Sequence, residues 1–417
     1  MNLLLKSAKI IDSHNGKLHS KKRDILIKNG VIDKIAVEIA PENKTETVSL
    51  TNLHISPGWF DSGVSFGEPG FEERETIANG LQTAAKSGFT DIVLNPNTHP
   101  VPDSGSDIVF LRNAGKGHLT DLHPLGALTV KAEGNDLAEL YDMKNTGAVG
   151  FYDFKHPIEN ANLLKIALQY VSNFGGLAYS FPMDTSVAGK GNVNEGESSV
   201  RLGLKGIPAL AEELRIVRDL FILEYTEGKL HIPTISTAGS VKLIADAKKK
   251  GLDVSCSVAV HNLFYSDSEL KEFDAAYKVL PPLRTKKDMD ALTEGLRDGI
   301  VDFVTSDHIP MNIEKKEMEF ENAAFGSIGL ESAFGSLNRI FGMETAIGLL
   351  TKGRERYGLK LAQIKEGEPA DLTLFDPDAE YRFDQGDITS SSKNSMFLGA
   401  KLKGRVYGII NNGQILI

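Results

Sequence analysis

The amino-acid sequence predicts an α/β protein in which a closed (β/α)8 barrel carries a smaller β domain. Three observations support this prediction. Eight short apolar segments recur along the middle of the chain, helical segments separate most of them, and both chain ends carry β-rich runs instead. Alternating strands and helices form parallel sheets, and eight such units close into a barrel. An open doubly wound sheet is the alternative, but no glycine-rich phosphate-binding turn follows any predicted strand.

Both chain ends predict short β structure. An Asn-Gly pair, the strongest short hairpin signal, stands at Asn29-Gly30 in "DILIKNGVIDKI" and at Asn412-Gly413 in "YGIINNGQILI". The segment "ADLTLFD" (370–376) alternates like a strand. Neither end is long enough to bury a core alone, so we expect the two ends to combine. The predicted division is residues 1–55 for the first part of a β-sandwich, 56–360 for the barrel and 361–417 for the second part.

The eight predicted barrel strands are "GWFDSGV", "DIVLN", "LGALTV", "AVGFYD", "GLAYSF", "LHIPTI", "DVSCSV" and "VDFVTS". Among the intervening segments, "IPALAEELRIVRDLFILE" has the period of an amphipathic helix that begins near Pro208. Its apolar face consists of Leu210, Leu214, Val217 and Phe221. The only cysteine of the chain, Cys256, lies in the apolar alternation of "LDVSCSVAV", which indicates a packed thiol.

Composition narrows the class of protein. The 417 residues carry a formal net charge of −10, which argues against a nucleic-acid or anionic-membrane surface. The N-terminal "MNLLLKSAKIID" is too short in apolar residues for a signal peptide, and no run of about 18 apolar residues follows. We therefore expect a cytoplasmic protein with neither nucleic acid nor membrane as partner.

In a barrel of this kind, chemistry takes place at the carboxyl ends of the strands. Two carboxylates stand there, Asp153 and Asp307, and Asp307 is the best candidate for a proton-transfer residue. Asp153 could equally cap a helix or hold the following loop. The other groups at strand ends are Gly63, Ser65, Asn95, Asn97, His99, Ser180, Phe181, Thr234, Ser236, His261, Asn262 and His308. A catalytic zinc site needs three or more protein ligands around an open position, and few imidazoles aim between these carboxylates.

The histidines divide by position. His231 lies three residues before Thr234, so on a strand it should point to the opposite face and pack against the helices. His99, His261 and His308 lie beyond strands and are candidates for a pocket. The remaining histidines fit no ligand spacing and are expected on the surface or in packing: His14, His19, His54, His118, His123 and His156.

The motifs at the strand ends resemble those of dihydroorotase, a cyclic amidohydrolase family, along nearly the whole chain. "PGWFDSGVSFGEPG" is similar to P-G-x-x-D-x-H-V-H-x-R-E-P-G, and "NPNTHPVPD" to M-P-N-T-x-P. "VLPPLRTKKD" is similar to K-x-N-P-P-L-R-x-x-x-D, and "TSDHIPMNIEKK" to T-D-H-A-P-H-x-x-x-E-K. The resemblance implies a TIM barrel of the metal-dependent amidohydrolase type, with a small β-sandwich built from both termini.

The same resemblance implies that the reactive groups of the family have been replaced. Its metal-binding histidines align with Gly63, Ser65, Phe181 and Thr234, which leaves Asp153 and Asp307 as the residual metal positions. The substrate-binding arginine, asparagine and histidine of the family align with Gly67, Leu280 and Met311. Asn97 retains a substrate-contacting position, and His261 completes the predicted substrate-binding set.

Three functions follow as hypotheses. The first is a catalytically inactive dihydroorotase homologue, a pseudoenzyme of de novo pyrimidine biosynthesis, that is homodimeric, lacks a cofactor and serves as a structural partner of aspartate carbamoyltransferase. The second is an active dihydroorotase or other cyclic-amide hydrolase, converting dihydroorotate and water to N-carbamoyl-aspartate. Its site would be rebuilt from Asp153, Asp307 and His261, with zinc if the metal site is rebuilt. The third is a small-molecule sensor that keeps a pocket without the chemistry.

Overall fold

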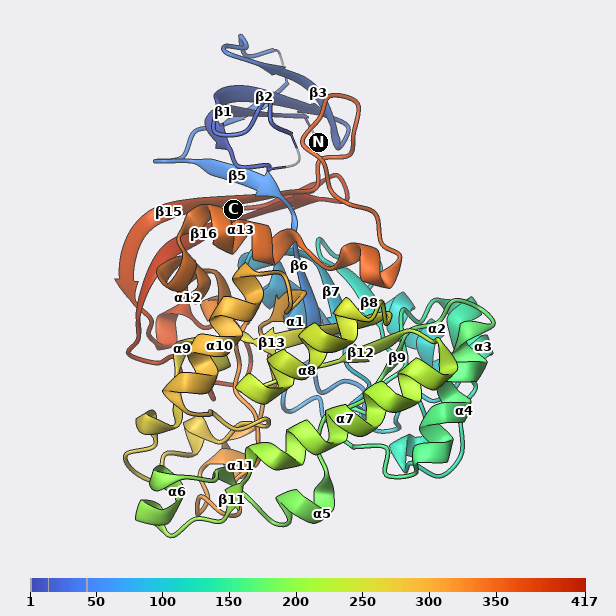
Figure 1. Ribbon diagram of the computed structural model, residues 1–417. Coiled ribbons are helices and arrows are strands. Elements are labelled where there is room, and N and C mark those ends of the chain that lie inside the picture. The colour runs from blue at the N-terminus through green and yellow to red at the C-terminus, as the bar shows by residue number, and fades with distance from the viewer. Residues whose placement is uncertain (1, 14, 43) are drawn as a thin grey trace.

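The computed structural model describes residues 2–13, 15–42 and 44–417, and it places a β-sandwich at one end of a barrel (Figure 1). His14 lies outside the described residues. The strands of both termini form one eight-stranded sheet in the order β17-β16-β15-β5-β1-β2-β3, with β4 paired to β1. These strands are β1 (Asn2–Ile10), β2 (Lys22–Lys28), β3 (Val31–Ala36), β4 (Glu46–Val48), β5 (His54–Pro57), β15 (Leu372–Arg382), β16 (Lys401–Asn411) and β17 (Gln414–Leu416).

The two predicted hairpins are confirmed. Asn29 and Gly30 join β2 to β3 with φ angles of 52° and 79°, and Asn412 and Gly413 join β16 to β17 with 52° and 70°. Positive φ at both central residues is the geometry of a type I′ turn, which matches the twist of the flanking strands. The central pairing is between β5 and β15, and it joins the two ends of the chain.

The parallel (β/α)8 barrel is confirmed. Its strands are β6 (Trp59–Val64), β7 (Phe89–Leu94), β8 (Asp121–Pro124), β9 (Ala178–Tyr179), β12 (Leu230–Ile232), β13 (Val254–Ala259) and β14 (Phe303–Thr305). The fourth position is reduced to Phe151, which makes parallel bridges to Gly126 and Ala178. The circuit closes where the Ser65 N–H donates to the His308 carbonyl at 2.8 Å.

The third strand lies earlier in the chain than predicted. The apolar run "LGALTV" (125–130) follows β8 instead of forming it. Two polar residues of β8 are satisfied at the base of the barrel: Asn411 Nδ2 donates to Asp121 at 3.1 Å, and His123 Nε2 lies 2.8 Å from Asp91. A strand whose polar groups are paired in this way has no apolar signature, so the sequence pattern missed it.

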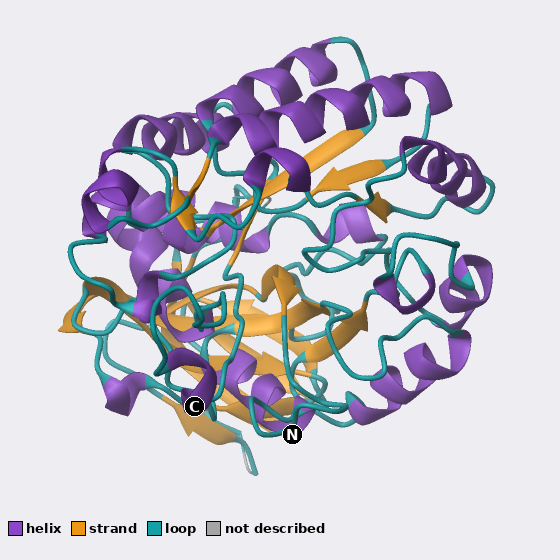
Figure 2. Cartoon of the chain, turned by 90° about the horizontal axis from the view of Figure 1, so that it is seen from below, coloured by secondary structure: helices purple, strands orange, loops and turns teal. Residues whose placement is uncertain are grey.

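Helices surround the strands (Figure 2). The longer ones are α1 (Ile77–Lys86), α2 (Gly105–Ala114), α3 (Leu140–Thr146), α4 (Ala161–Ser172), α7 (Ala209–Thr226), α8 (Ala238–Lys249), α10 (Lys286–Arg297), α12 (Leu330–Phe341) and α13 (Met343–Thr351). Shorter elements in the loops are α5 (Thr185–Ala188), β10 (Val193–Asn194), α6 (Glu197–Leu202), β11 (Gly206–Ile207), α9 (Val260–Phe264) and α11 (Ile313–Lys316). Within the described ranges, no helix is long and apolar enough to cross a membrane.

The barrel strands separate two cores. Outward-facing residues pack against the helices, among them Cys256, which is fully buried, so the predicted packed thiol is confirmed. Burial raises the pKa of this thiol far above its usual range. Inward-facing aromatic residues fill the barrel itself: Phe60, Tyr179 and Phe303 contact Tyr357, which enters after α13.

The residues predicted as the apolar face of helix α7 lie on its outer side, whereas Ile216, Leu220 and Leu223 pack inward against the core. Leu210, Leu214 and Phe221 are 56%, 43% and 68% exposed, whereas Glu212 and Arg215 on the opposite face are 2% and 1% exposed. The buried charges have specific partners. The Glu212 carboxylate accepts from the Ser236 N–H at 2.7 Å, and Arg215 donates to the Ile158 carbonyl at 2.7 Å. These polar contacts and the buried Ile216, Leu220 and Leu223 together fix the rotation of the helix.

A buried ionic network joins the base of the barrel to the sandwich. The Arg354 guanidinium contacts Asp91 on β7, lies 3.2 Å from Asp371 beside β15, and donates to Thr90 Oγ1 at 2.8 Å. Burial raises the pKa of Asp371 to about 6, against the opposing effect of the Arg354 charge. The network therefore contributes a titratable carboxyl at the junction of the two domains.

Candidate active site

The carboxyl ends of the barrel strands lie at the end of the barrel away from the sandwich. Strand β5 of the sandwich ends at Pro57 and β6 begins at Trp59, so the amino end of β6 adjoins the sandwich. Because the barrel strands are parallel, all their carboxyl ends share the opposite side, and the strand-end residues named from the sequence gather there.

Asp153 braces a neighbouring loop. Its carboxylate accepts from the backbone N–H groups of Leu128 and Thr129, at 2.8 and 3.0 Å, and from the Thr129 hydroxyl. Burial raises the pKa of Asp153, although these three hydrogen bonds act in the opposite direction. The contacts correspond to the loop-holding role that the sequence left open. They use both carboxylate oxygens.

Asp307 is paired with a lysine that sequence reasoning missed. The Lys155 ammonium lies 2.9 Å from Asp307 Oδ2 and also donates to the Leu280 carbonyl. The two side chains are only 10% and 4% exposed. Burial raises the pKa of Asp307, and the Lys155 charge opposes that shift. The signal in the sequence was a lone lysine two residues beyond Asp153, where φ of 56° turns the chain at Lys155.

The four residues that stand at the family's histidine positions do not form a ligand set. Gly63 has no side chain, Ser65 Oγ accepts from Asn95 Nδ2 at 3.3 Å, and Phe181 is 2% exposed within the aromatic filling of the barrel. Thr234 has a φ of 48°, and its hydroxyl has no hydrogen-bond partner in the part of the chain that the structure describes. No group of three or more His, Cys, Asp or Glu side chains within residues 2–13, 15–42 and 44–417 is arranged to hold a metal ion. The residues present do not fit a zinc centre.

The space between these residues is very small. A cavity of about 20 Å³ lies between Gly63, Asn95, Lys155, Thr234 and Asp307. A single water needs roughly 10–15 Å³ by such a measure, whereas small-molecule pockets occupy about 300–1,000 Å³. The centre of the barrel therefore has room for about one water and none for a cyclic amide.

His231 faces this cavity, so the prediction that it packs against the helices is wrong. Its ring stacks on Phe303 at 5.2 Å, and its nitrogens lie 2.9 and 3.3 Å from the hydroxyls of Ser255 and Ser257. Strand β12 ends at Ile232, and the positive φ of Thr234 breaks the alternation on which the prediction relied. Both residues consequently line the same cavity. Burial lowers the pKa of His231 well below its usual range.

The two predicted substrate-binding residues lie outside the lining of this cavity. Asn97 is half-buried, and its Oδ1 has no hydrogen-bond partner within residues 2–13, 15–42 and 44–417. His261 is the second residue of the short helix α9 and is 2% exposed, and its Nε2 has no hydrogen-bond partner among the described residues. Burial, with a contribution from the Lys155 charge, lowers the pKa of His261 to about 3. His99 is an exposed loop residue that lies against Phe71.

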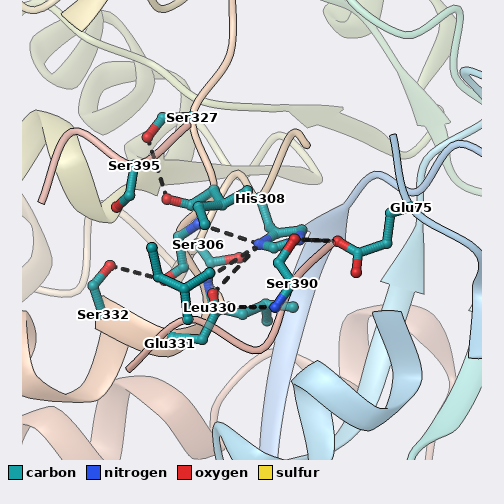
Figure 3. Close-up of polar contacts among 12 residues, drawn as sticks. Glu75, Ser306, His308, Ser327, Leu330, Glu331, Ser332, Ser390 and Ser395 are labelled. Carbon is teal, nitrogen blue, oxygen red and sulfur yellow. Dashed lines mark hydrogen bonds and ion pairs between the residues drawn. The ribbon is translucent and has the colours of Figure 1, made fainter. Parts of the chain in front are cut away.

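His308 is held in a buried polar cluster and does not face the cavity (Figure 3). Its Nδ1 accepts from the Gly329 N–H at 3.2 Å, so the proton stands on Nε2, which donates to Glu75 at 3.2 Å. The hydroxyl of Ser390, from the segment between β15 and β16, also donates to Glu75, and the Ser390 backbone N–H donates to the cluster's second carboxylate, Glu331, at 3.0 Å. The cluster fastens the C-terminal segment to the barrel loops.

A larger cavity lies at the mouth of the barrel. It measures about 420 Å³ and is lined by Leu280, whose carbonyl accepts from Lys155 of the central cavity. Its lining includes Met183, Lys190, Lys205, Leu280, Glu321 and Phe325. This volume falls within the range of small-molecule sites, and its lining carries charges of both signs.

Comparison with known proteins agrees with the motifs. Residues 53–240 match a protein family described as Dihydro-orotase-like. Over the full chain, the sequence is 36% identical to the dihydroorotase of Pelotomaculum thermopropionicum and 37% identical to that of Ruminiclostridium cellulolyticum, covering 99% of each.

Solved structures give the same fold. The L-hydantoinase (dihydropyrimidinase) of Arthrobacter aurescens superposes with a TM-score of 0.86 at 21% identity, over 99% of this chain and 95% of that one. The dihydropyrimidinase of Brevibacillus agri gives 0.83 at 20% identity, over 100% and 95%. At these identities the structures support the amidohydrolase barrel alone. The sequence relatives are more than 30% identical over the full chain, so they identify the family. The chain belongs to the dihydroorotase family.

Proposed function

We propose that this chain is a non-catalytic member of the dihydroorotase family that serves pyrimidine biosynthesis as a structural partner of aspartate carbamoyltransferase in the cytoplasm. The observation that carries the proposal is the ion pair between Lys155 and Asp307. An ammonium group stands against a carboxylate that the family motif assigns to metal binding. The same cation would repel a metal ion at that carboxylate.

The energetic argument concerns the attacking water. A zinc-bound water has a pKa near 7, against 15.7 for free water, so losing the metal raises the cost of forming hydroxide by about 12 kcal/mol. Neither Asp153, which holds a loop, nor Asp307, which is paired with Lys155, is free to act as a substitute base. With a central cavity of about 20 Å³, substrate has no room beside them.

The structural role rests on the resemblance and on what the chain retains. The barrel, the sandwich and their junction are intact, while the groups for metal and substrate binding are replaced. A protein under selection only for its surface and stability would show this combination. We therefore expect co-purification with aspartate carbamoyltransferase and a heteromeric complex when the two proteins are mixed at micromolar concentration.

The deciding experiment measures metal content by elemental mass spectrometry after incubation with excess zinc and desalting. We expect far less than one zinc per chain, and no dihydroorotate hydrolysis above that of a Lys155→Met, Asp307→Ala control. One or two zinc ions per chain would overturn the non-catalytic assignment and favour an active cyclic-amide hydrolase. Absence of a complex with the transcarbamoylase would overturn the structural role separately.

A second candidate function, small-molecule sensing, is favoured by the cavity of about 420 Å³ at the barrel mouth. Lys190, Lys205 and Glu321 would give it polar contacts, and Met183 and Phe325 an apolar wall. Titration calorimetry with dihydroorotate, N-carbamoyl-aspartate and uncharged ureides distinguishes this role, because a sensor binds one of them saturably and leaves it unchanged.

A further inference from the structure

The cavity of about 420 Å³ at the mouth of the barrel lies between two loops. Residues 183–207, which contain α5, β10, α6 and β11, supply most of its lining, and Leu280, Glu321 and Phe325 supply the rest. Figure 1 shows α5, α6 and β11 at the end of the barrel away from the sandwich. Among the described residues, none lines both this cavity and the central one, so the mouth cavity is a site of its own.

Two buried lysines hold one wall of the mouth cavity in place. The Lys278 ammonium donates to the Glu321 carbonyl at 2.9 Å and lies 4.8 Å from the centre of the Phe325 ring. Lys316 donates to the carbonyl groups of the two residues that flank Phe325, at 3.0 and 2.9 Å. Lys278 and Lys316 are 2% and 7% exposed. Because these ammonium groups already order the wall, a ligand that contacts it loses less free energy to ordering on binding.

The facing loop carries two lysines without a counter-charge. Lys190 and Lys205 line the cavity and are exposed, and within the described ranges of the chain neither ammonium group forms an ion pair or a hydrogen bond. They lie on adjoining segments, because the Asn192 N–H donates to the Lys205 carbonyl at 2.8 Å. Of the described lining residues, Glu321 alone carries a negative charge. Two positive charges against one, in a chain of net charge −10, favour an anionic ligand.

The type of cation indicates the type of anion. Arginine, whose planar fork suits a carboxylate, is absent from the lining in the part of the chain that the structure describes. Lysine binds phosphate as a point charge, and the flexible stems of Lys190 and Lys205 allow both ammonium groups to approach one phosphate. A phosphate monoester carries up to two negative charges at neutral pH, which matches two unpaired lysines.

The apolar part of the lining indicates what the phosphate is attached to. Met183, Ile207, Leu280 and Phe325 line the same cavity as the lysines. Planar rings stack on phenylalanine, and nucleobases do so regardless of their sequence identity. A methionine thioether also makes favourable contacts with aromatic rings. Glu321 supplies an acceptor for sugar hydroxyls, and the volume lies in the range of about 300–1,000 Å³ that small-molecule sites occupy.

We propose that the mouth cavity binds a nucleoside monophosphate, with its phosphate between Lys190 and Lys205 and its base on Phe325. This assignment gives the ligand class for the sensing role that stands above as the second candidate function, and it rests on that role. It is independent of the partnership with aspartate carbamoyltransferase. Because the lining holds the base by stacking, pyrimidine and purine nucleotides both serve as probes.

The first test is titration calorimetry of the full chain with uridine 5′-monophosphate and adenosine 5′-monophosphate. We expect saturable binding with a Kd of about 100 µM or tighter, and binding of uridine at least ~30-fold weaker because it lacks the phosphate. The double variant Lys190→Glu, Lys205→Glu should weaken nucleotide binding by at least ~30-fold. The matched control is Lys17→Glu, Lys22→Glu, which makes the same charge change at exposed residues of the sandwich end. Absence of saturable binding, or an equal loss in both double variants, overturns the proposal.

The second test separates the base from the phosphate. Phe325→Ala should weaken uridine 5′-monophosphate about 10-fold and leave ribose 5-phosphate unchanged, because only the nucleotide carries a ring. An equal loss for both ligands would mean that the variant has damaged the loop, and equal affinities of the native protein for the nucleotide, ribose 5-phosphate and inorganic phosphate would mean that no base is bound. Either result overturns the nucleotide assignment.

The third test separates this proposal from the proposed functions. Tighter binding of dihydroorotate or N-carbamoyl-aspartate than of the nucleotides would overturn the phosphate assignment and leave the sensing role in place. Binding of nucleotides by a chain that also takes up zinc would support the mouth site while overturning the non-catalytic assignment. The two conclusions are therefore decided by different measurements on the same protein.

Discussion

The Lys155 ammonium lies 2.9 Å from the Asp307 carboxylate at the centre of the barrel, and both side chains are nearly excluded from solvent. The pair supplies a positive charge from within the chain at a position where the family motif implies a metal ion. A buried carboxylate without a counter-charge would destabilise the fold. In a barrel that lacks the family's histidines, Asp307 is therefore tolerated only because Lys155 pairs with it.

Replacing Lys155 with methionine should therefore destabilise the protein. We expect the free energy of unfolding to fall by about 3–5 kcal/mol, because Asp307 keeps its burial and loses its counter-charge. Urea denaturation at neutral pH measures the effect. Adding Asp307→Leu should recover most of the loss. The exposed pair of Lys286 and Asp290 is the control, since Lys286→Met should change the free energy by no more than about 0.5 kcal/mol. Equal effects at the two lysines would contradict the argument.

The two glycines of the first-strand motif should respond differently to alanine. A Cβ at Gly67 would lie 1.8 Å from the Phe71 carbonyl oxygen, whereas a Cβ at Gly63 would have its nearest neighbours, Asn95 and Thr305, at 3.6 Å. We expect Gly67→Ala to cost about 1–3 kcal/mol or more and Gly63→Ala to stay within about 1 kcal/mol. Thermal unfolding of the pair checks this. If Gly67→Ala were neutral, the loop could still admit the family's arginine.

Stability should depend on pH through Asp371. Burial raises its pKa to about 6 from an ordinary value of 3.8, so the folded state holds this proton more tightly than the unfolded chain. Its contribution is fully present below about pH 4 and is lost as the pH rises through about 6. Relative to the native protein, Asp371→Asn should therefore gain stability between pH 4 and 6. Urea titrations across that range measure the difference, with the exposed Asp290→Asn as control. A difference that stays constant with pH would contradict the assignment.

An apolar residue at the buried face of α7 should destabilise the protein despite its hydrophobicity. Glu212→Leu leaves the backbone N–H groups of Ser236 and Thr237 without their acceptor, and we expect a loss of about 3 kcal/mol. Glu294→Leu on the exposed side of α10 is the matched substitution and should have an effect within about 0.5 kcal/mol. Chemical denaturation of both variants gives the comparison. Similar values would mean that Glu212 is not what orients the helix.

Much of the fold was predictable because its signals are local. The Asn-Gly turns, the alternation of β15 and the recurring barrel strands each depend on a few consecutive residues. The third strand was misplaced because Asp121 and His123 find their partners far away in sequence, at Asn411 and Asp91. Likewise, the helical period of α7 did not show which side of the helix is buried. The contacts of Glu212 and the packing of Ile216 and Leu220 against the core decide it.

In the candidate site, the sequence predicted only which of the family's functional residues are replaced. Motif comparison identifies Gly63, Ser65, Phe181 and Thr234 as replacements, since these positions are fixed by alignment. It could not reveal Lys155, whose direction depends on a left-handed backbone angle and whose partner lies 152 residues later. The inward position of His231 was not predicted for a related reason. Strand β12 ends at Ile232, so the alternation of side chains does not continue to Thr234.

The pairing of β5 with β15 has a consequence for synthesis on the ribosome. Strand β5 is complete at Pro57, but its neighbour begins at Leu372. At a synthesis rate of about 5–20 residues per second, the edge of β5 stays uncovered for roughly 15–60 s before β15 is made. An uncovered edge is a template for pairing with another nascent chain. Truncation before Leu372, or slow translation of the final segment, should therefore yield aggregates nucleated at residues 54–57, which a ribosome-associated chaperone would have to shield.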